Sequence, residues 1–84
     1  MTTYNGYESY DHWNTALWLN NDEKFYNLMI NETEEAVYMH QTIADTIANI
    51  IKQLPEQTPD GAQWQGDTIV ELVLENYNEM LEHS

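Results

Sequence analysis

The chain has 84 residues, of which 15 are Asp or Glu and only 2 are Lys or Arg, so its formal net charge is -13. This length allows a single domain, which we assign to residues 1–84. An acidic surface repels phosphates, which excludes sequence-independent binding to DNA or RNA and favours basic protein surfaces as partners. Hydrophobic residues at 42% argue against a disordered chain.

Cysteine is absent, which rules out disulfides, thiolate nucleophiles and cysteine-ligated zinc. The sequence has no run of about 18 apolar residues, and its N-terminus lacks the basic and apolar regions of a signal peptide. We therefore expect no membrane contact and a cytoplasmic location.

A turn and a short helix are predicted first. Asn5 and Gly6 form a typical turn dipeptide in an extended lead-in over residues 1–8. Ser9 then offers a side-chain cap for a helix over residues 10–19.

Two further helices are predicted before the first proline. Asn20, with Glu23 three residues later, resembles a capping box for a second helix that we expect to end near Ile30. Thr33 would cap the third helix, which Pro55 ends. Residues at three- and four-residue spacing predict its apolar face: Ala36, Val37, His40, Ile43, Ala44, Ile47, Ile50, Ile51 and Leu54.

A loop over residues 55–66 is predicted next, followed by a last helix that Asp67 caps and that runs to about His83. Leu72 lies off the predicted inner face. That face comprises Ile69, Val70, Val73, Leu74, Tyr77, Met80 and Leu81. Short connections imply antiparallel neighbours, so the expected fold is all-α, a small three- or four-helix bundle with an extended lead-in.

Glutamates in the last helix form a row at helical spacing, opposite its predicted inner face. Four-residue steps advance about 6 Å along a helix, so such a row can approximate a row of phosphates. The alternative is an ordinary solvated face, since Glu is a good helix former. The row comprises Glu71, Glu75, Glu79 and Glu82, with Glu34, Glu35 and Asp45 as a second row.

Aromatic side chains supply either interface anchors or core mass. We expect Trp13 and Phe25 in the core. For Tyr7 and Trp64 an exposed contact with a partner is the functional interpretation, and packing at the core edge is the structural one.

Catalytic and metal motifs are missing. His40 lies on a predicted apolar face and is expected to be a hydrogen-bonded core residue. No Glu-x-x-His, His-Glu-x-x-His or EF-hand pattern occurs, and a convex row of carboxylates does not converge as metal ligands must. The serines are a predicted cap and the last residue. We predict no enzyme activity, no catalytic residue, no metal and no cofactor.

The segment from Tyr4 to Glu23 resembles a motif of small, uncharacterised phage and prokaryotic proteins, close to YNGW-x-NYETWN-x-ALW-[LI]-x-N-[DE]. This chain has Tyr7 at the first Trp and Ser-Tyr-Asp-His-Trp, ending at Trp13, in place of the NYETW core. The resemblance covers about a quarter of the chain. It implies a phage or mobile-element setting, and hence a phage-infected bacterial host. It does not indicate which activity the protein has.

Size, helical pattern and acidity are also similar, in physical type and not in sequence, to DNA-mimic proteins that inhibit CRISPR or restriction systems. The first hypothesis is therefore a non-enzymatic inhibitor that blocks the basic DNA-binding surface of a host protein: a CRISPR effector, a restriction enzyme or a repair glycosylase. The alternative is an acidic assembly module that forms a homodimer through the third helix. A small metal-dependent or acid-base enzyme is a third class, which no motif supports.

Overall fold

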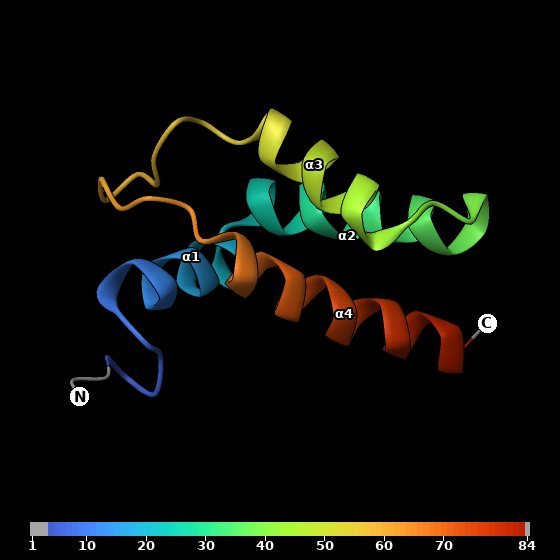
Figure 1. Cartoon of the computed structure of the whole chain (residues 1–84), viewed down its shortest axis with the longest axis horizontal. Coiled ribbons are helices and arrows are strands. Elements are labelled where there is room, and N and C mark those ends of the chain that lie inside the picture. The colour runs from blue at the N-terminus through green and yellow to red at the C-terminus, as the bar shows by residue number, and fades with distance from the viewer. Residues whose placement is uncertain (1–3, 84) are drawn as a thin grey trace.

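The computed structural model describes residues 4–83, which form an all-α bundle (Figure 1). Its helices are α1 (Tyr10–Asn21), α2 (Glu23–Met39), α3 (Ile43–Gln53) and α4 (Gly66–Glu82). Within this part of the chain, none of the helices has the length and apolar character that crossing a membrane requires. The all-α prediction is confirmed.

The lead-in folds back on itself at the expected turn. Asn5 and Gly6 both have positive φ, 47° and 87°, and the turn brings Tyr4 and Tyr7 together as an isolated bridge with two backbone hydrogen bonds of 2.7 Å. Ser9 caps α1 as predicted, because its hydroxyl accepts a hydrogen bond from the backbone N–H of His12. Residues 1–3 of the predicted lead-in lie outside the described residues.

The predicted boundary near Ile30 is wrong, because α2 is one helix of 17 residues. Its cap is Asp22, whose carboxylate accepts from the N–H of Phe25, and not Asn20. Thr33 lies inside the helix, fully buried, and its hydroxyl donates to the carbonyl of Met29 at 2.7 Å. Threonine can satisfy its hydroxyl in this way within a helix, so its presence alone did not mark a helix start.

The actual break between α2 and α3 falls at His40. This residue ends α2 in the left-handed conformation, with φ of 56°, and it is exposed, so the prediction that it lies in the core is wrong. Thr42 caps α3 by accepting from the N–H of Asp45. Apolar spacing continues across the break, because α2 and α3 both bury residues in the same core. Periodicity therefore did not reveal the break.

The last helix differs from the prediction in its first residue and in which of its side chains are buried. It starts at Gly66 after Gln65, and Asp67 lies in its first turn instead of capping it. Leu72 is buried, whereas Leu74 and Leu81 are exposed by 38% and 47%. Apolar residues lie around much of α4, so only packing against the other helices decides which of them are buried. The end of α3 before Pro55 is as predicted, with Leu54 as its C-cap.

The core lies between α2 and its neighbours, since α2 contacts each of the other three helices. Phe25 is buried as predicted, but Trp13 is only half-buried and packs against Tyr4 and Tyr10 outside the central cluster. The central buried cluster comprises Ala16, Leu19, Phe25, Met29, Ile50, Leu54, Ile69, Leu72 and Val73.

A polar network attaches the loop between α3 and α4 to α1, at the end of the bundle where Figure 1 shows both. Asn14 is fully buried; its amide donates to the Asp60 carboxylate at 2.9 Å and its carbonyl accepts from the Thr58 hydroxyl at 2.6 Å. Trp18 donates its indole N–H to the same Asp60 oxygen at 2.9 Å. The backbone N–H of Gln65 donates to Thr15, so the loop is held up to the residue before α4. The network thus sets where α4 begins.

Replacing Asn14 by Ala should lower the free energy of unfolding by about 1–3 kcal/mol, because the buried Thr58 hydroxyl then loses its acceptor. Urea denaturation followed by circular dichroism measures this. Asn20→Ala, at an exposed position of the same helix, is the control and should leave the stability unchanged or slightly raised. Equal effects of the two substitutions would contradict the role given to the network.

Replacing His40 by Gly should raise the free energy of unfolding by about 0.5–1 kcal/mol, since glycine adopts the left-handed conformation without steric cost. The same denaturation experiment measures it. The matched control is His83→Gly, because His83 also follows a helix but has a negative φ of -105°. A destabilised His40→Gly variant would show that the histidine side chain stabilises the break.

Candidate functional site: an acidic surface

Carboxylates cover the surface of the bundle. All 15 acidic residues lie in the described range and none is buried; three are partly buried, namely Asp11, Asp22 and Glu32, and the others are exposed. Both lysines, Lys24 and Lys52, are exposed. Within residues 4–83 the ion pairs found involve His12 and no lysine, so most of the negative charge faces solvent without a cationic partner.

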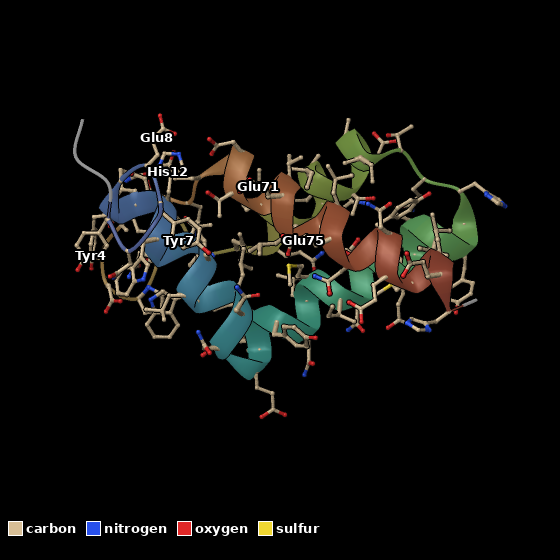
Figure 2. The ribbon with its side chains drawn as sticks, turned by 90° about the horizontal axis from the view of Figure 1, so that it is seen from below. Tyr4, Tyr7, Glu8, His12, Glu71 and Glu75 are labelled. Atoms are coloured by element: carbon tan, nitrogen blue, oxygen red, sulfur yellow. The ribbon has the colours of Figure 1, made fainter. Side chains whose placement is uncertain are left out.

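The glutamate row of α4 is exposed along its whole length, as the spacing predicted. Glu71, Glu75, Glu79 and Glu82 are all exposed, and Figure 2 shows Glu71 and Glu75 following one another along the helix. The row is not purely acidic, since the exposed Leu74 and Leu81 lie beside it.

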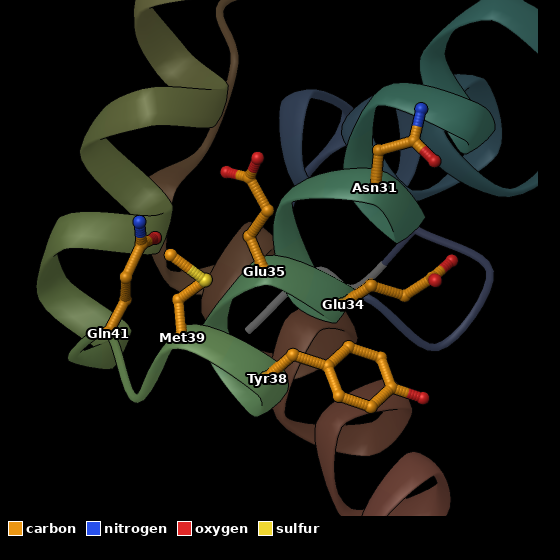
Figure 3. Close-up of a pocket in the computed structure, with 6 residues that line it drawn as sticks. All are labelled: Asn31, Glu34, Glu35, Tyr38, Met39 and Gln41. Atoms are coloured by element: carbon orange, nitrogen blue, oxygen red, sulfur yellow. The ribbon is translucent and has the colours of Figure 1, made fainter.

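The second predicted row lies around the break between α2 and α3, at the end of the bundle where α4 also ends (Figure 1). Glu34 and Glu35 line an open groove of about 620 Å³ with Tyr38, Met39 and Gln41 (Figure 3). Tyr38 and Met39 are each 69% exposed, and the buried side-chain oxygen of Gln41 has no hydrogen-bond partner among the described residues. Asp45 is exposed in the first turn of α3. The carboxylates here are accompanied by apolar surface.

Of the two aromatic candidates for partner contact, Trp64 makes most of its contacts within the chain. Its ring packs edge-on against Phe25, with centroids 5.4 Å apart, and its N–H donates to the carbonyl of Pro55 at 2.9 Å. Tyr7 is half-buried and packs against the core, but it also lines a surface cavity of about 340 Å³ together with Glu71. That cavity connects the lead-in to the glutamate row.

Three potential ligands converge in this cavity, and sequence reasoning did not bring them together. His12 Nε2 lies 3.1 Å from an Asp67 carboxylate oxygen and 3.5 Å from a Glu8 carboxylate oxygen. Its other nitrogen, Nδ1, lies 2.7 Å from the Ser9 hydroxyl. Figure 2 shows Glu8 and His12 beside the beginning of α4. Asp67 is 55 residues away from His12 in sequence, so no local motif marks the group.

Ser9, His12 and Asp67 thus form a hydrogen-bonded series of hydroxyl, imidazole and carboxylate, the residue types of a nucleophilic triad. The Ser9 oxygen, however, also accepts from the His12 backbone N–H as the cap of α1. A hydroxyl held in this way orients the imidazole and stabilises the helix, so we assign Ser9 a structural role.

The whole chain matches one family of known protein sequences. The sequence model of a family described as a family of unknown function, DUF7249, matches residues 1–84. The chain belongs to this family. No curated protein matches the chain, and no solved structure matches it either. The DUF7249 membership fits the expectation of an uncharacterised family and assigns no activity.

The Asp60 carboxylate accepts hydrogen bonds from the side chains of Asn14 and Trp18, and these bonds stabilise its ionised form. The side chain of Asn14, and to a lesser extent that of Trp18, lowers the pKa of Asp60 below its ordinary value of 3.8. Both donors come from the N-terminal segment that carries the motif resemblance. The charge of Asp60 therefore stabilises the fold.

The pH dependence of stability should reveal this role. A lowered pKa means that the folded state favours the ionised form, so the stabilisation is complete above pH 3.8 and decreases as the pH falls below that value. The difference in unfolding free energy between the wild type and Asp60→Asn should therefore shrink on acidification. Glu56→Gln, in the same loop, is the control. A difference that is constant with pH would contradict the assignment.

Proposed function

We propose that this protein is a non-enzymatic inhibitor that mimics DNA and occupies the basic DNA-binding surface of a host defence protein. The observation that carries the proposal is the continuous exposure of carboxylates without cationic partners, above all in the α4 row. Occupation of the surface would exclude DNA, and no chemistry is required. A CRISPR effector, a restriction enzyme and a repair glycosylase are the target classes.

Charge density supports the comparison with DNA. The bundle is 38 Å long, and B-DNA of that length carries about 22 phosphate charges at one per 1.7 Å. A net charge of -13 on the protein is therefore more than half that of the duplex. Each four-residue step of the α4 row advances about 6 Å, close to the rise of two phosphates along one strand.

The placement of the row is costly for α4, which argues against a purely structural origin. Glutamates four residues apart repel each other by about 0.2–0.5 kcal/mol per pair. Glu79 and Glu82 also lie near the C-terminal end of the helix, where the helix dipole disfavours negative charge. A solvated face built from alternating Glu and Lys would avoid both effects.

A homodimer through α3 is the alternative function. Ile51 is 47% exposed and offers apolar surface for a second copy, although Ile50 of the same helix is fully buried within the chain. Sedimentation at several protein concentrations tests the alternative, because an assembly module requires a tight homodimer, whereas a DNA mimic can act as a monomer or as a dimer.

The proposal predicts that Glu75→Gln/Glu79→Gln weakens binding to the target at least about tenfold, since each charge-assisted hydrogen bond contributes about 1.5–3 kcal/mol. The inhibition is measured as phage plating in bacterial strains that each carry one defined restriction or CRISPR system, and as release of damaged bases from DNA by purified repair glycosylases. Added salt should weaken the wild-type complex.

Glu23→Gln/Glu56→Gln is the matched control, because it removes the same two charges at exposed positions outside both rows. It should inhibit as strongly as the wild type, and circular dichroism should show that both variants are folded. Equal inhibition by the two double variants would exclude the α4 row as the surface that binds the target. If the wild type inhibited none of these systems, the proposed function would be rejected.

A further inference from the structure

We propose that Glu8, His12 and Asp67 form a zinc site that joins the lead-in and α1 to the beginning of α4. This inference does not depend on the proposed function, because the site lies at one end of the glutamate row and requires neither Glu75 nor Glu79. Glu8 precedes α1, His12 lies in its first turn and Asp67 lies in the first turn of α4.

The separations between the donor atoms fit a tetrahedral ion. Ligands about 2.0–2.2 Å from a tetrahedral zinc lie roughly 3.3–3.6 Å from one another. Of the two distances from His12 Nε2, the 3.5 Å to Glu8 lies within this range and the 3.1 Å to Asp67 lies just below it. The three donor atoms all lie within 4.8 Å of one another. Small side-chain rotations therefore suffice to bind the ion.

The Ser9 hydroxyl supplies the support that a metal-binding histidine requires. Such a histidine donates its other ring N–H to a fixed acceptor, which leaves the ligating nitrogen unprotonated. Ser9 Oγ lies 2.7 Å from His12 Nδ1, and its two lone pairs can accept both this N–H and the backbone N–H of His12. Nε2 then faces two carboxylates, an arrangement that a cation stabilises.

The surroundings favour zinc over calcium or magnesium. An imidazole nitrogen with two carboxylates suits zinc, whereas calcium and magnesium require six or more oxygen ligands. The carboxylates of Glu8 and Asp67 are 70% and 67% exposed, so the ion can enter without desolvating buried groups. The cavity of about 340 Å³ leaves room for a water as the fourth ligand, and Glu71 lines it as well.

Without a metal, the same geometry would serve a simple hydrogen bond from His12 Nε2–H to Asp67. The two arrangements place the proton on different ring nitrogens, and ¹⁵N chemical shifts of the His12 imidazole distinguish them. Adding zinc to the full chain should move the proton to Nδ1 and give a Nε2 signal typical of a metal-bound nitrogen.

Titration with zinc, followed by calorimetry, should show one saturable site in the wild type. His12→Gln and Asp67→Asn should each weaken binding by more than about tenfold, because even the loss of a supporting hydrogen bond costs a metal site 10–100-fold. Glu8 lies outside all four helices. Glu8→Gln should therefore weaken zinc binding without affecting the formation of the helices. Cobalt should give the intense visible absorption of a four-coordinate complex.

Two controls separate this site from general attraction of cations by an acidic protein. Glu75→Gln/Glu79→Gln removes two charges elsewhere and should keep the affinity for zinc, as should His83→Gln. Zinc should also raise the Tm of the wild type and not that of His12→Gln. Unchanged affinity in both His12→Gln and Asp67→Asn, or a six-coordinate cobalt spectrum, would overturn the proposal.

Discussion

The buried amide of Asn14 is the contact on which the arrangement of this bundle depends. It joins α1 to Thr58 and Asp60 in the loop that follows α3, and Trp18 reinforces the same carboxylate. A buried amide must have partners for both its polar ends, so the loop cannot move away without a substantial free-energy cost. Because this loop leads into α4, the contact determines where the last helix starts.

The position of α4 in turn arranges the charges. Asp67 comes within 3.1 Å of His12, and the glutamates that follow it remain exposed along the helix. Acidic residues in the first turns of the four helices complement the helix dipoles, so part of the net charge stabilises the fold. The α4 row begins after the first turn of its helix and has no such structural benefit, which is why we associate it with a partner.

Local signals in the sequence were reliable where one short segment decides the outcome. The Asn5-Gly6 turn, the Ser9 cap, the end of α3 before Pro55 and the exposure of the α4 glutamates all follow from neighbours within a few residues. The helix boundaries around His40 were not predictable from spacing, since two consecutive helices that face one core continue the same apolar pattern. The buried face of α4 was ambiguous for a similar reason, because its apolar residues surround much of the helix.

The sequence by itself determined an all-α chain with a strongly acidic character, because composition and helical spacing are properties of single residues and short segments. Only the tertiary structure decided that His12 pairs with Asp67. The same holds for the hydrogen bonds that Asn14 and Trp18 donate to Asp60. These contacts join residues 42 to 55 positions apart, and no local pattern encodes which distant side chains meet. Packing of α4 against α1 and α2 brings them together.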